Sequence, residues 1–268
     1  QAPVRKVRIT GGEPLLLPWL PLLVGRLRRL LPHATLALTT NGMRLGDLAV
    51  ELRGQGLDRV NISLDAAEEA AFQRVAGRPG LDRVLAGISA AQRAGFNGIK
   101  LNTVMLRGLN GDQLVKICRL AATLRVEPRF IELMPLGAGG AMHPEQYLGS
   151  EEALALLMNE LQHVRHLGRE GAADRHLLRD GDRQVTVGFI TPMSDPFCDT
   201  CDRVRLDPDG RLLGCLRSED GIDLLGAVRD ANNHGDLVLA RRQVRHLLES
   251  KCQVAGPWPR RSMASIGG

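Results

Sequence analysis

Val7-Arg8-Ile9-Thr10-Gly11-Gly12-Glu13-Pro14 is a short strand-forming segment that runs directly into a turn. Val, Ile and Thr favour a strand, and two glycines followed by proline end it. The leucine-rich residues 15–31 then predict a helix, with Pro18 and Pro21 either in its first turn or breaking it in two. A strand followed by a helix is the unit from which parallel sheets are built.

The same pattern recurs along the first half of the chain. Predicted strands of this kind cover residues 7–10, 35–40, 59–64, 99–105 and 129–133. Predicted helices follow them at residues 15–31, 45–55, 81–94 and 111–124. Repeated strand–helix units favour an α/β fold, here a partial (β/α) barrel of TIM-like type.

The pattern changes after residue 137. Ser150 is expected to cap a helix over 151–161, residues 183–191 predict a strand, and residues 222–229 and 236–250 predict helices. We therefore expect two domains: a partial barrel over 1–140 and a smaller α+β region over 141–268.

One alternating face of the predicted strands is polar. Because residues two apart on a strand share a face, the sequence groups Lys6, Arg8 and Thr10; Thr39 and Asn41; Asn61, Ser63 and Asp65; and Lys100 and Asn102. If these faces point into the barrel, its lumen is a polar, cationic chamber. The alternative is that they face outward and make satisfied polar pairs with the helices.

Three of the five cysteines lie close together near residue 200. Cys198 and Cys201 are three residues apart, and Asp209-Gly210 predicts a hairpin turn that would return Cys215 toward them. Three thiolates without an obvious fourth ligand favour an iron–sulfur cluster with one open iron. A redox dithiol, or a zinc site completed by Asp199, Asp202 or a distant histidine, remains an alternative.

Composition limits the classes of protein. The chain is 44% hydrophobic but only 3% aromatic, so few side chains are available to stack on nucleic-acid bases. Its net charge of +5 suits an anionic small molecule. No run reaches the roughly 18 apolar residues that a membrane span needs. The odd cysteine count argues against a disulfide framework, so we expect a cytoplasmic protein. From the few aromatic residues and the lack of a long apolar run, we expect it to bind neither nucleic acid nor membrane.

Together these motifs resemble the radical S-adenosylmethionine GTP 3′,8-cyclases of molybdenum cofactor biosynthesis. The resemblance rests on Lys6 to Pro14, Thr39 to Gly42, Asn61 to Asp65, Lys100 to Asn102, Arg129 to Pro135, the three cysteines with Arg203-Val204-Arg205, and the closing Gly267-Gly268. It implies a lyase in which a 5′-deoxyadenosyl radical removes the ribose 3′ hydrogen of GTP, after which the carbon radical attacks guanine C8.

The resemblance also implies roles for individual residues. Gly11, Gly12, Glu13, Ser63 and Met134 would contact S-adenosylmethionine. Predicted GTP contacts are Lys6, Arg8, Thr39, Lys100, Arg129, Arg203, Val204 and Arg205. Cys198, Cys201 and Cys215 would hold a 4Fe-4S cluster whose open iron binds guanine. Arg203, Arg205 and the tail residues Gly267 and Gly268 would assist catalysis. Arg129 and Met134 have opposite strand parity, so the strand ends before Met134 or contains a bulge.

The chain departs from this family at its beginning. The family's CxxxCxxC motif lies upstream of the glycine turn, yet here no cysteine precedes Cys118. The chain opens with Gln1, so we expect the natural N-terminus and the first barrel strand of the family's six to be absent. The full-length family binds two clusters; we expect this chain to bind at most one and to generate no radical.

The resemblance further implies a downstream partner, cyclic pyranopterin monophosphate synthase, and is compatible with a homodimer. Two other functions remain open: a radical enzyme with an auxiliary cluster acting on a different substrate, and a non-catalytic zinc-binding barrel. The identity of the bound metal separates the zinc-binding barrel from both enzymes.

Overall fold

The structure is a computed structural model that describes residues 4–137, 140, 145–218, 221–234, 237–249 and 251. The chain forms two compact units, which we treat separately. Unit 1 comprises residues 1–133 with 144–196, and unit 2 comprises residues 134–143 with 197–268.

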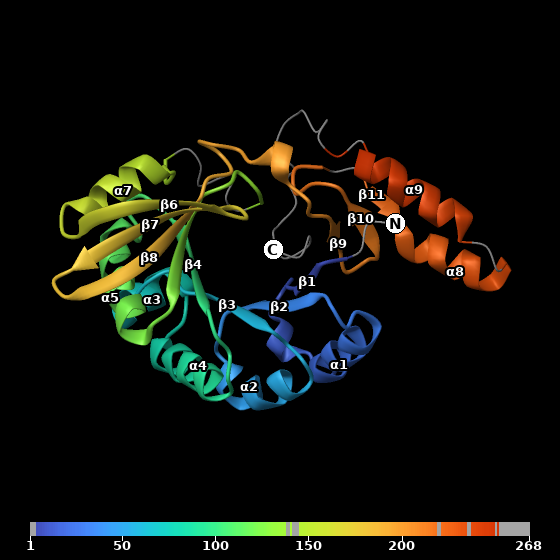
Figure 1. Cartoon of the computed structure of the whole chain (residues 1–268), viewed down its shortest axis with the longest axis horizontal. Helices are drawn as coiled ribbons and strands as arrows, with labels where there is room; N and C mark the ends of the chain where they lie inside the picture. The colour runs from blue at the N-terminus through green and yellow to red at the C-terminus, as the bar shows by residue number, and fades with distance from the viewer. Residues whose placement is uncertain are drawn as a thin grey trace. The chain divides into compact units, whose positions relative to one another are not determined.

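The described strands of unit 1 form one open, twisted sheet in the order β1-β2-β3-β4-β5-β8-β7-β6 (Figure 1). They are β1 (Lys6–Ile9), β2 (Thr35–Thr40), β3 (Arg59–Ser63), β4 (Lys100–Met105), β5 (Glu127–Glu132), β6 (Gln162–Glu170), β7 (Ala173–Asp180) and β8 (Arg183–Ile190). Strands β1 to β5 pair in parallel in chain order, which confirms the predicted α/β fold with a partial barrel.

Helices follow the parallel strands and cover the outer face of the sheet in Figure 1. The helices of unit 1 are α1 (Leu20–Leu30), α2 (Leu45–Gly54), α3 (Glu69–Ala76), α4 (Leu81–Arg93), α5 (Leu114–Leu124) and α7 (Ser150–Met158). The predicted helix 15–31 is split into a 3-10 turn at Pro14–Leu16 and α1, because Pro18 lies between them and Pro21 can occupy only the first turn of a helix.

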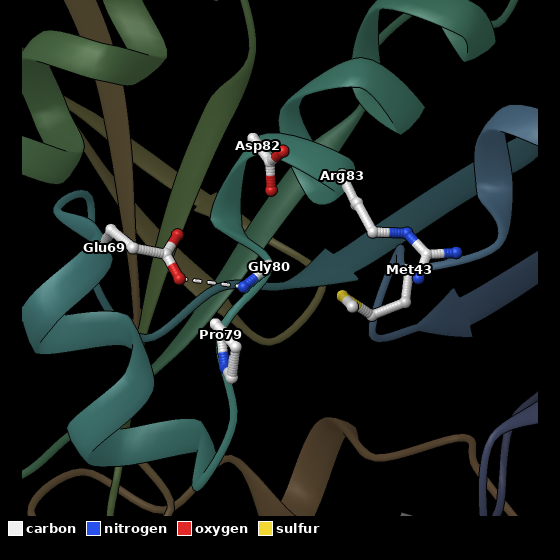
Figure 2. Close-up of a pocket in the computed structure, with 6 residues that line it drawn as sticks. All are labelled: Met43, Glu69, Pro79, Gly80, Asp82 and Arg83. Carbon is white, nitrogen blue, oxygen red and sulfur yellow. Dashed lines mark hydrogen bonds between the residues drawn. The ribbon is translucent and has the colours of Figure 1, made fainter.

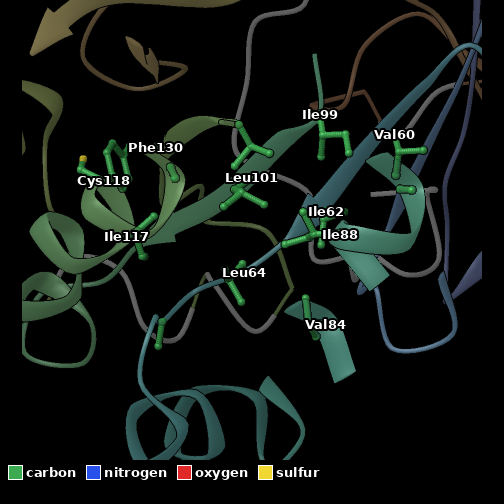
Figure 3. Packing of buried hydrophobic residues seen from close by; sticks show 14 of the residues in the cluster. Val60, Ile62, Leu64, Val84, Ile88, Ile99, Leu101, Ile117, Cys118 and Phe130 are labelled. Atoms are coloured by element: carbon green, nitrogen blue, oxygen red, sulfur yellow. The ribbon is translucent and has the colours of Figure 1, made fainter. Parts of the chain in front are cut away.

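The core lies between these helices and the sheet. Figure 3 shows part of it, with side chains from β3, β4, β5, α4, α5 and the residues next to β3 and β4: Val60, Ile62, Leu64, Val84, Ile88, Ile99, Leu101, Ile117, Cys118 and Phe130. Most of them are fully buried, and burying one such side chain stabilises the fold by about 1.5–3 kcal/mol. Cys118 is one of these core residues, as its apolar neighbours in the sequence suggest.

Residues 145–196 extend the sheet of unit 1, although the sequence pattern placed them in the second domain. Strand β8 pairs in parallel with β5, and the Phe130 and Phe189 rings lie 5.7 Å apart, so this segment shares the core of the barrel. The antiparallel strands β6 and β7 were not predicted. The compact units therefore divide the chain differently from the predicted boundary at residue 140.

Unit 2 contains a small antiparallel sheet and two helices. They are β9 (Arg205–Leu206), β10 (Arg211–Leu213), β11 (Gly221–Asp223), α8 (Leu224–His234) and α9 (Val238–Glu249). The predicted hairpin is confirmed: Leu213 pairs with Arg205, and Gly210 donates its backbone N–H to the Asp207 carbonyl. Within the described ranges, the structure contains no helix long and apolar enough to cross a lipid bilayer.

Candidate functional site

The glycine turn after β1 leaves space beside its backbone. Gly11 has φ +125°, a conformation that side chains with a Cβ rarely adopt. A Cβ added at Gly12 would meet no atom within 4 Å. The turn therefore contains an open cradle that a ligand could enter, which fits the predicted place of the methionine end of S-adenosylmethionine.

Glu13 ties this turn to the end of β2. Its Oε1 accepts hydrogen bonds from Leu15 N at 3.0 Å and Thr40 Oγ1 at 2.6 Å, and its Oε2 accepts one from Asn41 N at 2.7 Å. Both carboxylate oxygens are therefore occupied within the protein. These bonds hold the turn in position, and the predicted contact of Glu13 with the cofactor stays a prediction.

A pocket of about 200 Å³ lies at the carboxyl ends of β2 and β3. Its lining residues are Asn41, Met43, Ser63, Asp65, Phe72, Val75, Ala76 and Arg78. Ser63, a predicted cofactor contact, is among them. Binding sites of barrel folds gather at this end of the strands.

Asp65 in this pocket is a perturbed acid that the sequence indicated only through its place at a strand end. Burial raises the pKa of Asp65 to about 6, against a hydrogen bond from Val104 N at 2.8 Å that favours the charged form.

A second, more open hollow of about 650 Å³ lies next along the surface and shares Met43 with the first. Figure 2 shows Glu69 reaching across it to Gly80. The Glu69 carboxylate accepts from Gly80 N at 2.8 Å and Leu81 N at 2.9 Å, where α4 begins. Glu69 thus caps a helix. None of the predicted site residues lines this hollow.

The predicted cations of unit 1 lie together on one face of the sheet. In the register, Asn61 is paired with Lys100 and Asn102 with Arg129, so these side chains form rows across neighbouring strands. Arg8 donates from Nη1 to Thr39 Oγ1 at 2.9 Å. The opposite face carries the buried apolar residues that contact the helices.

The pKa of Lys6 indicates how close the cations of this face are to one another. Its pKa falls to about 8, first through desolvation and then through the positive charges of Arg8, Arg59, Lys100 and Arg129. Four of these five residues were predicted GTP contacts; Arg59 was not. Positive charges gathered this closely create a positive electrostatic potential, which attracts an anion.

Two glutamates that the sequence pattern did not reveal partly neutralise this set. Glu170 Oε1 lies 3.0 Å from Lys100 Nζ and 3.4 Å from Arg129 Nη2, and Glu127 Oε1 lies 2.8 Å from Arg129 Nε. Desolvation and the charge of Arg129 lower the pKa of Lys100 despite the opposing effect of Glu170. Glu127 could have been found from its strand parity with Arg129, whereas Glu170 lies on the unpredicted strand β6.

Two further features of this face were not predicted. The side-chain oxygen Oδ1 of Asn102 is buried and has no hydrogen-bond partner, so it offers an acceptor to a bound molecule. Gly188 of β8 lies beside Arg129 and closely approaches β7, because a Cβ there would lie 3.5 Å from Arg129 Cγ and only 3.1 Å from Ala173 Cβ.

Met134 follows the end of β5 at Glu132, which settles the parity question: the strand ends before Met134. Met134 belongs to unit 2, where its carbonyl accepts a hydrogen bond from Leu136 N at 2.8 Å.

The three cysteines of the predicted cluster site are all in unit 2 and are free thiols. Cys198 begins a 3-10 turn, and Cys201 N donates to the Cys198 carbonyl at 3.1 Å, so one turn presents both thiols. Cys215 follows the hairpin, and its sulfur accepts from Arg217 N at 3.4 Å. Their donor type suits either of the two metal alternatives, although the three cysteines are not among the described groups whose ligand atoms all lie within 4.8 Å of one another.

Positive groups surround the thiols. Burial alone would raise the pKa of Cys201, but the Arg203 backbone N–H and the charges of Arg203 and Lys251 hold it below its usual value. Lys251 Nζ lies 3.4 Å from Cys201 Sγ, a contact that no sequence pattern indicated. A thiol with a lowered pKa is readily present as the thiolate that binds iron, so Cys201 fits the ligand chemistry of an iron–sulfur cluster, which cysteine thiolates normally hold.

The remaining predicted residues of unit 2 flank the thiols. The Arg203 guanidinium lies 4.8 Å from the centre of the Phe197 ring, Val204 is exposed, and Arg205 begins β9. Burial and the charge of Arg203 lower the pKa of Arg205, while Cys215 and Cys201 oppose this. Gly267 and Gly268 lie outside the described residues, as does Cys252.

Comparison with known proteins assigns the family. Residues 1–121 match the family model of the Radical SAM superfamily, and residues 126–254 match that of Molybdenum Cofactor Synthesis C. A curated GTP 3′,8-cyclase from Rhodopirellula baltica is 40% identical over 99% of this chain and 76% of its own length. One from Moorella thermoacetica is 36% identical over 99% of this chain and 82% of its own length. Both halves of the chain and both candidate sites lie within these matches, and the chain belongs to the GTP 3′,8-cyclase family of radical S-adenosylmethionine enzymes.

Proposed function

We propose that this protein is a GTP 3′,8-cyclase that converts GTP to (8S)-3′,8-cyclo-7,8-dihydroguanosine 5′-triphosphate in the first step of molybdopterin biosynthesis. The observation that carries the proposal is the set of cations on the polar face of unit 1, where burial and then the charges of four positive neighbours lower the pKa of Lys6. A triphosphate is a small, highly charged anion that such a set suits.

The cations and Thr39 would bind the triphosphate. Lys100 and Arg129 have side chains only 12% and 10% exposed, so their charges act with little screening by water. Arginine adds paired N–H donors that match phosphate oxygens. The residues proposed for the triphosphate are Lys6, Arg8, Thr39, Lys100 and Arg129. Further proposed GTP contacts are Arg203, Val204 and Arg205.

S-adenosylmethionine would be held by Gly11, Gly12, Ser63 and Met134, with Glu13 keeping the turn in place through its bonds to Thr40 and Asn41. Cys198, Cys201 and Cys215 would hold one 4Fe-4S cluster. The open iron of that cluster would bind guanine. The hydrogen-abstracting radical would instead come from S-adenosylmethionine and a separate reduced cluster, the one that the family's CxxxCxxC motif binds. Gly267 and Gly268 are proposed to assist that step.

The cluster assignment can be tested on this chain without measuring turnover. After anaerobic reconstitution with iron and sulfide, we expect about three to four irons per chain and an EPR signal that GTP shifts. The variant Cys198→Ser/Cys201→Ser/Cys215→Ser should retain none of this iron. Cys118→Ala, which removes a buried core thiol, should retain all of it.

Two results would contradict the proposal. Binding of one zinc with no iron uptake would indicate a structural metal site. A full cluster whose EPR signal ignores GTP would favour a radical enzyme that acts on a different substrate.

A further inference from the structure

The β6–β7 hairpin of unit 1 gathers histidines that the proposed cyclase reaction does not use. His166 and His176 are directly opposite each other in the antiparallel register, and Asp174 precedes His176 by two residues on the same face. One ligand atom from each of these three residues lies within 4.8 Å of the other two. We call these residues the hairpin triad.

A bulge brings a third histidine to the same place. His163 and His166 are three residues apart, so a regular strand would point them to opposite faces. The register shifts between His163 and Arg165, which inserts one extra residue and puts His163 beside His176. The rings of His163 and His166 lie 5.3 Å and 4.9 Å from the ring of His176.

The distances suit coordination of one cation. Asp174 Oδ1 lies 2.6 Å from His166 Nε2, and Asp174 Oδ2 lies 3.3 Å from His176 Nε2. Ligands bound to zinc at roughly 2.0–2.1 Å in a tetrahedron are about 3.3 Å apart. The His166 side chain is 55% exposed, so it can move outward by the small amount needed.

Two neighbouring side chains hold His176 in the way that residues around a metal site hold its ligands. His163 Nε2 lies 3.1 Å from His176 Nδ1, so His163 Nε2 can accept a hydrogen bond from the Nδ1–H of His176 and leave His176 Nε2 as the ligand atom. The edge of the His176 ring packs against the buried Phe189 at 5.8 Å, and the His176 side chain is only 13% exposed. One potential ligand is therefore held in a fixed orientation before any ion arrives.

We propose that His166, Asp174 and His176 form a binding site for a borderline divalent transition-metal cation such as Zn²⁺, with His163 as a positioning residue and water completing the coordination. Two imidazoles and one carboxylate match Zn²⁺, whereas Mg²⁺ and Ca²⁺ require oxygen ligands. All four residues belong to unit 1, whereas the three cysteines of the predicted cluster belong to unit 2.

The test must remove the competing thiols. Zn²⁺ is titrated calorimetrically into the full chain carrying Cys198→Ser, Cys201→Ser and Cys215→Ser, and we expect one Zn²⁺ per chain. Adding His166→Gln or Asp174→Asn should weaken binding by at least about 100-fold, and His163→Gln by about tenfold. His33→Gln, which removes an exposed histidine elsewhere in unit 1, should change nothing.

A second measurement guards against misfolded variants. Zn²⁺ should raise the unfolding temperature of the triple Cys→Ser chain but not that of the same chain carrying His166→Gln, because only a ligand bound to the native state stabilises it. Equal affinity in the His33→Gln, His166→Gln and Asp174→Asn variants, or no Zn²⁺ binding to the triple Cys→Ser chain, would overturn the proposal. Either result would leave the cyclase proposal intact.

Discussion

Asp65 carries a charge that costs folding energy. Burial raises its pKa to about 6, so the native state favours the protonated acid. Its contribution to stability is therefore complete below about pH 4 and is lost as the pH rises through 6. We predict that Asp65→Asn, which can still accept from Val104 N, raises the free energy of unfolding at pH 7 by up to about 3 kcal/mol.

Urea unfolding between pH 4 and 7 measures this effect. The wild-type chain should lose stability across that range relative to Asp65→Asn. Glu51→Gln, on the exposed face of α2, is the matched control and should follow the wild type. Parallel curves for the wild type and Asp65→Asn would mean that Asp65 is well solvated.

Glu170 competes with the proposed triphosphate. Its carboxylate already pairs with Lys100 and Arg129, and its Oε2 lies 2.5 Å from Arg175 Nη1. An incoming anion must therefore displace the Glu170 carboxylate from these cations. Because the Glu170 side chain is 46% exposed, each pair is weak, about 0.5–1 kcal/mol. We predict that Glu170→Gln tightens binding of tripolyphosphate by about two- to fivefold.

Calorimetry at low salt checks this, with Glu160→Gln, which breaks an exposed pair with Arg119, as the control. Lys100→Gln should weaken binding. If Glu170→Gln weakened it as well, Glu170 would be holding the cations in place and not competing for them.

At the residue scale, strand parity was sufficient to group Lys6 with Arg8 and Lys100 with Asn102 on polar strand faces, whereas Arg129 entered the predicted set through the family resemblance. Parallel strands in register keep that parity from one strand to the next. Their binding of GTP stays a prediction. The opposing Glu170 could not be found, because its position depends on the pairing of β6 and β7, and Lys251 lies 36 residues beyond Cys215 with no pattern linking it to Cys201.

Among the elements, the βα units and the Asp209-Gly210 hairpin followed from local signals, but β6 and β7 did not. Their register shifts twice, so the period of two that identifies a strand is broken where histidines and arginines alternate. The predicted Ser150 cap was also wrong. Gly149 precedes the helix, and Ser150 N donates to the distant Glu132 carboxylate, a contact set by tertiary structure.

Glu132 joins three elements at the end of β5. Its buried carboxylate accepts from Ser150 N at 3.1 Å, Met193 N at 3.0 Å and Ser194 N at 2.9 Å. Burial alone would raise the pKa of Glu132, but these bonds and one from the Ser194 hydroxyl hold it below its usual value. We predict that Glu132→Gln, which replaces an acceptor with a donor, costs about 2–4 kcal/mol of stability.

Hydrogen exchange locates this loss. The amides of Ser150, Met193 and Ser194 should exchange faster in Glu132→Gln, while Glu152→Gln, which breaks an exposed pair with Arg107, should leave them unchanged. The lowered pKa of Glu132 also sets the direction of the pH dependence: its stabilisation is present above the ordinary glutamate pKa and is lost as the pH falls. A variant as stable as the wild type at pH 7 would contradict the role given to Glu132.

The whole molecule divides its proposed functions between its two units. Every residue proposed for the triphosphate set of Lys6, Arg8, Thr39, Lys100 and Arg129 belongs to unit 1, and all three thiols belong to unit 2. Each unit has its own sheet and its own charged groups around the candidate site. Ligand binding by one set should therefore survive the loss of the other.

We predict that the variant Cys198→Ser/Cys201→Ser/Cys215→Ser takes up no iron but keeps wild-type affinity for tripolyphosphate, an anion without guanine. Lys100→Gln/Arg129→Gln should do the reverse, because it removes two charges with little exposure to water and leaves every thiol in place. Iron analysis after reconstitution and calorimetry with tripolyphosphate give the two readouts on the same samples. If the thiol variant also lost tripolyphosphate, the phosphate site would need residues of unit 2, and Arg203→Gln and Arg205→Gln would then identify which of the proposed GTP contacts supplies them.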